Sequence, residues 1–170
     1  NKRILIVSPQ KWDGMYVSKH HYAIELAKKG NEVYFLGPPE ENVSIEIIPT
    51  KINNLFVVNH SLFFSPKLRF HIRRLYDILI QKHIRLVGKV VGKVDILWCF
   101  ELNLYKDLNW FDSGFKIFHP VDYINQTWQY KIGKSADVIF SVADNILEKF
   151  KTIDTPSFFI NHGLSEAFYH

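Results

Sequence analysis

The feature that most constrains the fold is the alternation of short apolar runs with longer amphipathic segments along the whole chain. We expect strands at 3–7, 32–36, 45–48, 55–58, 95–100, 115–119, 138–141 and 157–160, and helices at 17–29, 65–90, 124–133 and 144–151. Continuous apolar runs are typical of strands that are buried on both faces, and helices between them favour parallel pairing. The pattern therefore predicts an α/β fold with a doubly wound parallel sheet.

Two local signals set the bounds of the helices. Gly30 follows the last periodic residue of the first helix, so we expect it to end that helix as its C-cap. Ser65 and Pro66 are a helix start, and we expect one continuous helix from there to about Val90. Its apolar positions are expected to pack on the sheet as one stripe, made of Leu68, Ile72, Leu75, Leu79 and Leu86.

The cysteine and histidine content argues against a metal centre. A single cysteine, Cys99, excludes an internal disulfide and a thiolate metal site. His20 and His21 are adjacent, and side chains of adjacent helical residues point about 100° apart, so they are poorly placed to share one ion. We expect His21 to face the core and His20 to face a cleft, and we expect neither a metal nor a resident cofactor.

Positive charge is concentrated in one segment. Between Lys67 and Lys93 there are eight basic residues and one acidic residue, Asp77, while the whole chain carries a net charge of +4. A solvated helix face is one explanation, and docking on an anionic membrane surface is the other. No apolar run reaches the length of about 20 residues that spans a bilayer, and no signal peptide is visible. We therefore expect a cytoplasmic protein, and the docking alternative would place it at the inner face of the membrane.

Candidate site residues follow the predicted strands, because ligands of open α/β sheets bind beyond the carboxyl ends of the strands. Glu101 follows one strand, and His119 and Asp122 follow the next. An imidazole and a carboxylate at neighbouring strand ends are suited to general acid–base chemistry, so His119 and Asp122 are the candidate catalytic residues. Tyr123 adds a ring that could stack against a sugar or a base.

The loop after the first strand supplies a second group of candidates. Trp12, Asp13 and Gly14 lie between this strand and the helix that carries His20, a strand–loop–helix corner of the kind that binds anions. A nicotinamide or flavin site would need three glycines in this loop and an acidic residue after the second strand, and neither is present. The dinucleotide interpretation is therefore weak.

Three sequence blocks together resemble the N-terminal half of a GT-B glycosyltransferase. They are SPQKWDG…SKHHYAIELAKKGNEVYFLGPP, FHPVDYINQTWQYKIGKSADVIFSVADNILEKF and FFINHGLSEAF. The resemblance is to the large group of retaining, nucleotide-sugar-dependent enzymes similar to glycosyltransferase family 4. It covers essentially the whole chain, and it implies that residues 1–160 form a Rossmann-like acceptor-side domain and that 161–170 begin a linker.

The resemblance also implies a function and further site residues. The full-length protein would transfer a hexosyl group from a nucleotide sugar to a saccharide or lipid-linked acceptor, in cell-surface polysaccharide or glycolipid synthesis. A C-terminal domain beyond residue 170 would hold most of the nucleotide sugar, and this chain alone would be inactive. Trp12, Asp13, Gly14, His20 and Glu101, together with Tyr123, Asn161 and Gly163, would contact substrate.

Two other classes of function remain as alternatives. One is a stand-alone α/β ligand-binding or regulatory domain. The other is nucleic-acid binding through the basic segment, but the sequence shows no helix-turn-helix or other recognised nucleic-acid module. We therefore expect no nucleic-acid partner.

Overall fold

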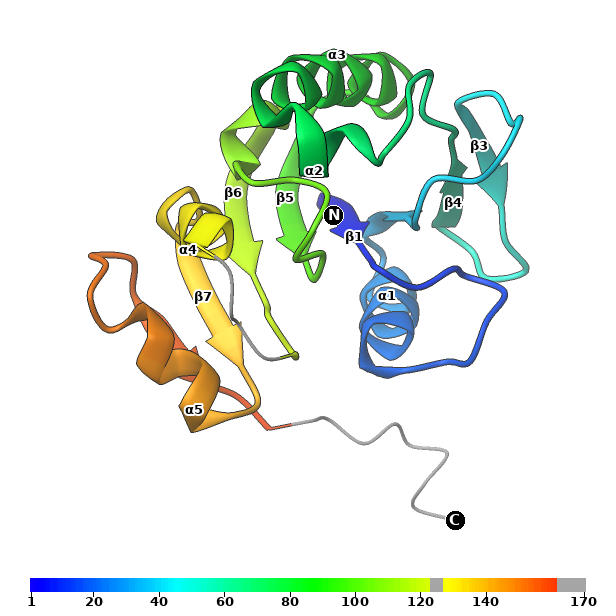
Figure 1. The fold of residues 1–170 in the computed structure, drawn as a ribbon. Helices are drawn as coiled ribbons and strands as arrows, with labels where there is room; N and C mark the ends of the chain where they lie inside the picture. The colour runs from blue at the N-terminus through cyan, green and yellow to red at the C-terminus, as the bar shows by residue number, and fades with distance from the viewer. Residues whose placement is uncertain (123–126, 162–170) are drawn as a thin grey trace.

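The computed structural model describes residues 1–122 and 127–161 as an eight-stranded sheet with helices on both faces. Its strands are β1 (Arg3–Val7), β2 (Glu32–Leu36), β3 (Glu46–Pro49), β4 (Leu55–Asn59), β5 (Val94–Cys99), β6 (Ser113–Phe118), β7 (Val138–Ser141) and β8 (Ser157–Phe159). Their order in the sheet is β3-β4-β2-β1-β5-β6-β7-β8 (Figure 1). All neighbours pair in parallel except β3, which runs antiparallel to β4 at the edge. The predicted doubly wound α/β fold is confirmed.

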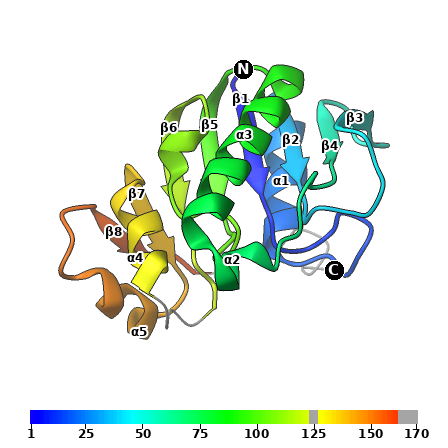
Figure 2. The same ribbon diagram turned by 45° about the horizontal axis from the view of Figure 1, so that its top comes forward.

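The helices divide between the two faces of this sheet. They are α1 (Ser18–Lys28), α2 (Leu68–His71), α3 (Arg73–Val91), α4 (Thr127–Lys134) and α5 (Asp144–Leu147), with 3-10 turns at Leu108–Trp110 and Glu148–Phe150. Buried residues of α3, α4 and α5 share one apolar cluster, and those of α1 belong to a second cluster on the other face. Figures 1 and 2 show α3 lying across one face and α1 on the opposite face.

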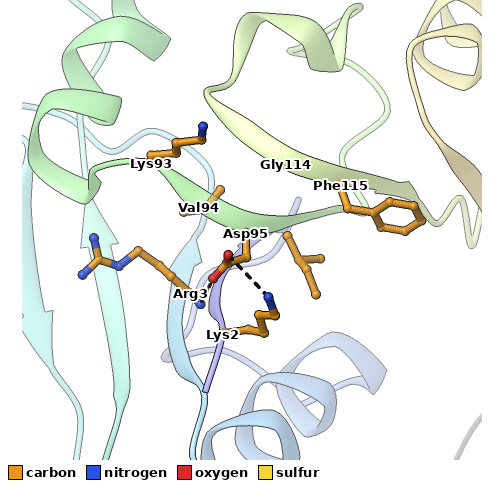
Figure 3. Close-up of a pocket in the computed structure, with 8 residues that line it drawn as sticks. Lys2, Arg3, Lys93, Val94, Asp95, Gly114 and Phe115 are labelled. Carbon is orange, nitrogen blue, oxygen red and sulfur yellow. Dashed lines mark hydrogen bonds and ion pairs between the residues drawn. The ribbon is translucent and has the colours of Figure 1, made fainter.

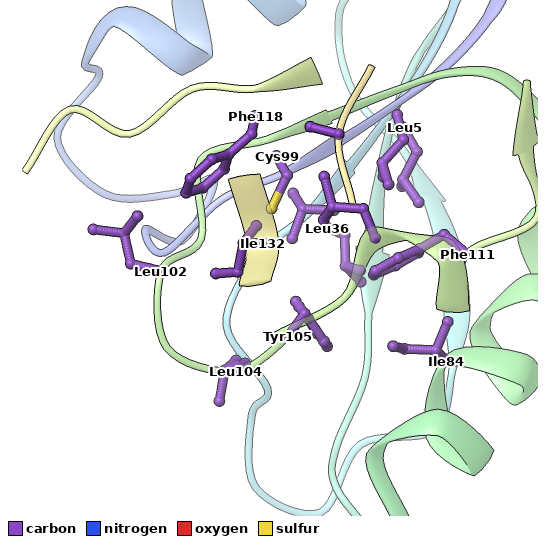
Figure 4. Close-up of a cluster of buried hydrophobic side chains, with 14 of the residues drawn as sticks. Leu5, Leu36, Ile84, Cys99, Leu102, Leu104, Tyr105, Phe111, Phe118 and Ile132 are labelled. Carbon is purple, nitrogen blue, oxygen red and sulfur yellow. The ribbon is translucent and has the colours of Figure 1, made fainter. Parts of the chain in front are cut away.

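The larger apolar cluster fixes the end of the sheet where the loops after β5 and β6 emerge. Leu5, Leu36 and Cys99 of the strands lie in it with Leu102, Leu104 and Tyr105 of the loop after β5 (Figure 4). The Tyr76 hydroxyl donates a hydrogen bond to the Leu104 carbonyl, 3.2 Å away, so α3 also holds this loop. Burial on this scale makes the loop a rigid platform rather than a solvated connection.

Gly30 ends α1 as its position predicts. Its φ is +83°, in the left-handed region that glycine adopts without steric cost, and its amide donates a hydrogen bond to the Ala27 carbonyl. The chain can therefore reverse at once and enter β2.

The single long helix predicted from Ser65 to Val90 is wrong. The chain forms α2, breaks at Ile72 (φ −132°, ψ 70°) and starts again as α3. Neither glycine nor proline lies at the break, so local propensity carries no signal for it.

The predicted packing stripe on this segment is also wrong. The buried residues of α3 are Tyr76, Asp77, Ile80, His83, Ile84, Val87 and Val91, whereas Ile72 and Leu75 are exposed. Two polar residues lie on the buried face, and each has a polar partner. Asp77 forms an ion pair with Lys106, and His83 forms a hydrogen bond with His60 at 2.9 Å. The spacing of apolar residues in the sequence does not identify a buried helix face that also contains paired polar residues.

Gly133 of α4 is a position where we expect a single methyl group to destabilise the domain. A Cβ added there would lie 2.8 Å from Cε1 of Phe150, which is a buried ring. We expect Gly133→Ala to lower the free energy of unfolding by about 1–2 kcal/mol, the scale of overpacking in a core. Gly88→Ala in α3 is the matched control. Nothing lies within 4 Å of its added Cβ, so we expect a gain of about 0.5–1 kcal/mol. Urea unfolding of both variants measures the difference, and equal effects would contradict the close packing.

Candidate functional site

The carboxyl ends of β1, β5 and β6 bring several predicted site residues to one edge of the sheet. β5 lies between β1 and β6, so Glu101 and His119 follow adjacent strands. The His119 amide donates a hydrogen bond to the Cys99 carbonyl at 2.8 Å, which extends the β5–β6 pairing to the point where the site begins. The Ser141 hydroxyl donates to the Pro120 carbonyl at 2.8 Å and fixes the turn after His119 from the β7 side.

His119 is held in one orientation by a hydrogen bond from Trp98. The Trp98 indole Nε1 lies 3.2 Å from Nδ1 of His119, and an indole N–H can only donate. Nδ1 must therefore accept, so the neutral ring carries its proton on Nε2. With its proton in this position, His119 is a hydrogen-bond donor through Nε2.

Aromatic rings surround His119. Its ring centroid lies 4.7 Å from that of Phe100, 6.0 Å from that of Tyr22 and 6.3 Å from that of Phe140. His119 is only 1% exposed. Sequence reasoning missed Trp98 as part of the site, although a tryptophan inside an apolar run signals that its N–H needs an acceptor nearby.

Lys19 is a site residue that the sequence analysis did not identify. It lies in the first turn of α1 and is 2% exposed, and its Nζ lies 5.7 Å from the centroid of the Phe100 ring. Burial lowers the pKa of Lys19, while the charges of Asp122 and Glu101 act in the opposite direction. Buried lysines are rare without a compensating partner, and the charges of Asp122 and Glu101 are those that favour the charged form of Lys19.

Glu101 has a structural role in the turn after β5. Its Oε1 accepts hydrogen bonds from the amides of Asn103, at 2.6 Å, and Leu104, at 3.2 Å. Burial raises the pKa of this carboxyl, and the two amides and Arg69 oppose that rise. This carboxyl therefore shapes the loop beside His119.

The predicted orientation of His20 and His21 is the reverse of the observed one. His20 is fully buried and His21 is half-buried. His20 Nε2 lies 2.9 Å from the Lys11 carbonyl, and its Nδ1 accepts from the Val17 amide at 3.2 Å. Because both ring nitrogens bond to the backbone of the loop that precedes α1, His20 closes that loop and does not face a cleft.

The ring of Trp12 packs beneath the loop that precedes α1. Its ring centroid lies 5.1 Å from that of Phe35 and 5.4 Å from that of His20, and the residue is largely buried. Together with the exposed Asp13 it lines a pocket of about 420 Å³ that extends toward the turn between β3 and β4. Trp12 belongs to the same α1-side cluster as Phe100, which contacts His119, but the lining of this pocket does not include His119.

The other predicted site residues have simpler positions. Gly14 is exposed, and a Cβ added there would make only an ordinary contact of 3.5 Å, so sterics do not demand glycine. Asp122 and Asn161 are exposed. Tyr123 and Gly163 lie outside the described residues.

A wide depression of about 780 Å³ lies at the opposite, amino-terminal edge of the strands (Figure 3). Lys2, Arg3 and Lys93 line it with Asp95. The Asp95 carboxylate accepts a hydrogen bond from the Arg3 amide at 2.8 Å and lies 3.7 Å from the Lys2 ammonium. Its charge is therefore already balanced, and this depression is not the candidate site.

Among residues 1–122 and 127–161, no group of three or more His, Cys, Asp or Glu side chains is placed to hold a metal ion. Within the same described ranges, no helix has the length and hydropathy needed to cross a bilayer.

Comparison with known proteins identifies this fold. The chain is similar to sucrose-phosphate synthase from Thermosynechococcus elongatus, with a TM-score of 0.66 and 11% identity over 97% of this chain and 49% of that chain. It is also similar to the E. coli trehalose-6-phosphate protein solved with UDP-2-fluoro glucose, with a TM-score of 0.60 and 11% identity over 95% of this chain and 49% of that chain. No protein-family model and no curated protein sequence matches the chain.

These likenesses establish the architecture. The chain has the α/β fold of one half of a GT-B glycosyltransferase, and it spans about half the length of these two solved structures. The fold expected from the sequence blocks is thereby confirmed.

Proposed function

We propose that this chain is the acceptor-side half of a glycosyltransferase that uses a nucleotide sugar. The observation that carries the proposal is the match of nearly the whole chain to one half of two solved structures. One is a sucrose-phosphate synthase, and the other is the trehalose-6-phosphate protein bound with UDP-2-fluoro glucose. The resemblance of the sequence blocks to retaining family 4 enzymes supports a hexosyl donor. It also supports a saccharide or lipid-linked acceptor in cell-surface polysaccharide or glycolipid synthesis.

In this proposal, His119 and Asp122 at the carboxyl edge of the sheet have different roles. His119, oriented by Trp98, donates a hydrogen bond through Nε2 to a sugar hydroxyl. Asp122 is exposed at the same edge and accepts a hydrogen bond from an acceptor hydroxyl, with the Lys19 ammonium within electrostatic reach. The nucleotide sugar is held mainly by a domain that follows residue 170, so the chain needs neither metal nor resident cofactor of its own.

The experiment that tests the function is nucleotide release by the protein that extends beyond residue 170. UDP- and GDP-hexoses are supplied with short saccharide and lipid-linked acceptors, and free nucleotide and glycosylated product are measured together. We expect release from one donor to depend on one acceptor. Release from no donor in the presence of any acceptor would overturn the proposal.

We also propose that the protein docks on the inner face of a membrane through the outer face of α3. Arg74, Lys82, Arg85 and Lys89 are exposed and recur with spacings of three to eight residues, which places them on one side of this helix. Ile78 lies among them and is 65% exposed.

Exposed apolar side chains also lie in α2, at the break and in the first turn of α3. Phe70 of α2 is 68% exposed, and Ile72 and Leu75 are exposed beside it. Large apolar side chains between cations are typical of surfaces that insert into lipid headgroups while their charges attract anionic lipids. The exposed apolar residues around the break therefore support membrane docking more than the helix with a single packed stripe that is expected from the sequence.

Vesicle co-sedimentation tests this docking. Each engaged basic residue contributes about 1 kcal/mol, so we expect Arg74→Glu, Lys82→Glu and Arg85→Glu together to abolish binding to anionic vesicles. The control is Lys29→Glu, Lys51→Glu and Lys134→Glu, which changes the net charge equally at exposed positions elsewhere. Equal loss in both triple variants, or equal binding to neutral vesicles, would show that α3 has only a solvated face.

A further inference from the structure

A basic pocket of about 350 Å³ lies between α2, the start of α3 and α4. It is lined by Arg69, Arg73, Lys106, Thr127, Trp128 and Lys131. Lys106 belongs to the loop after β5, which also carries Glu101, so the pocket adjoins the same edge of the sheet as His119. Four of its six lining residues are cations that come from three separate parts of the chain.

The charge in this pocket is only partly balanced. Asp77 forms an ion pair with Lys106, and its Oδ1 lies 3.4 Å from Nε of Arg73. Arg69 and Lys131 form no ion pair with any residue that the structure describes. Asp77 thus pairs with two of the four cations, and Glu101 acts electrostatically on Arg69. Positive charge still exceeds negative charge here, and this excess favours an anionic ligand.

Arg73 also has an unused donor. Its Nη2 is buried and has no hydrogen-bond partner in the described part of the chain. A buried donor without an acceptor is costly, and native structures usually satisfy such groups. An anion in the pocket would supply the acceptor.

Trp128 holds Arg73 in place for such a ligand. The Arg73 Cζ lies 5.0 Å from the centroid of the Trp128 ring, and the indole N–H donates to the Leu102 carbonyl at 3.3 Å. The ring is therefore fixed from the loop after β5, and the guanidinium is fixed by the ring on one side and Asp77 on the other. A guanidinium held in this way presents a fork of N–H donors that matches phosphate oxygens.

We propose that this pocket binds a phosphate or diphosphate ester of the acceptor substrate. The assignment of this ester to the acceptor substrate rests on the proposed glycosyltransferase function, whereas the affinity for phosphate rests on the pocket alone. The pocket is built from this half of the protein, and Arg69 also contacts the exposed Phe70 ring, with its Cζ 4.7 Å from the ring centroid. A phosphate group seated here would lie beside the apolar part of the proposed membrane surface.

The first experiment measures binding of inorganic diphosphate to the 170-residue chain at low salt. The indole N–H signal of Trp128 in a nitrogen-15 spectrum reports occupation of the pocket. We expect saturable shifts, and we expect Arg69→Gln with Lys131→Gln to weaken binding by about tenfold or more, because two charge-assisted contacts are lost.

The matched control is Arg74→Gln with Lys134→Gln, which removes two exposed cations from α3 and α4 outside the pocket. We expect it to change the dissociation constant by less than about twofold, since exposed charges are screened by salt. No saturable shift of the Trp128 signal, or equal weakening in both double variants, overturns the proposal. Lys131→Gln alone, at an exposed position, repeats the test if the double variant does not fold.

Two further probes distinguish the source of the phosphate. Tighter binding of farnesyl diphosphate than of inorganic diphosphate identifies a lipid-linked acceptor. Tighter binding of glucose 6-phosphate than of inorganic phosphate identifies a soluble sugar phosphate. Because these titrations need no sugar transfer, phosphate binding without transfer would refute the proposed function and leave the pocket assignment standing.

Discussion

Replacing His119 with Asn lowers the rate of sugar transfer by about tenfold or more in the protein that extends beyond residue 170, the scale expected for a group that acts directly on the substrate. The asparagine Oδ1 takes the position of Nδ1 and still accepts the hydrogen bond from Trp98. What is lost is the distal Nε2–H. The loss of rate therefore reports the contact with substrate more than the packing of the site.

His119→Gln is the matched variant for this prediction. Its amide nitrogen takes the position of Nε2 and can still donate, but the acceptor for the Trp98 indole is gone. We expect it to retain more activity than His119→Asn and to have the lower melting temperature, because a buried indole N–H loses its partner. Transfer rates and thermal unfolding of both variants are compared. Equal transfer rates for His119→Asn and the wild type would show that His119 does not contact the substrate.

The second large effect is loss of stability in acid, caused by the buried pair of His60 and His83. His60 Nε2 lies 3.0 Å from the Gly37 carbonyl, and its Nδ1 lies 2.9 Å from Nε2 of His83. Burial lowers the pKa of both rings, and that of His83 falls to about 4. The charge of His60 adds to the shift of His83, and Glu40 opposes the shift of His60.

The sign of this effect follows from proton binding. An unfolded histidine titrates at about 6.5, so between that pH and 4 the unfolded chain binds more protons than the folded one. The contribution of the two histidines to the free energy of unfolding is fully present above pH 6.5. It is lost as the pH falls toward 4, and the loss is about 3 kcal/mol for His83 alone. The raised pKa of Glu101 acts in the opposite direction.

Urea unfolding at several pH values between 4 and 7.5 measures the slope of the free energy of unfolding against pH. We expect His83→Leu to reduce it by about half or more and His71→Gln, at an exposed position, to leave it unchanged. A flat profile in the wild type would contradict the burial of the pair.

The strands of the sheet were predictable because parallel strands appear in the sequence as continuous apolar runs. The strand expected at 138–141 coincides with β7, and β1 and β2 also match their expected bounds. Failures came where tertiary contacts decide. The buried face of α3 depends on Lys106 and His60, which lie outside this helix in the sequence.

The candidate site was predictable only in part, for a related reason. His119 was found because it follows an apolar run, but its proton position depends on Trp98 in a neighbouring strand. The basic pocket joins Arg69 and Lys131, which are distant in sequence, and no local pattern predicts such a meeting. His20 was misplaced because helix periodicity does not report hydrogen bonds to a preceding loop.

The central claim is that this chain supplies the acceptor side of a two-domain site. Titration calorimetry with a panel of UDP- and GDP-sugars tests it most directly, on residues 1–170 and on the protein that extends beyond them. The account predicts a dissociation constant of about 10 μM or tighter for the longer protein, and binding weaker by about a hundredfold or more for residues 1–170, which lack most donor contacts. Micromolar binding by residues 1–170 alone would contradict it and would favour a stand-alone ligand-binding domain.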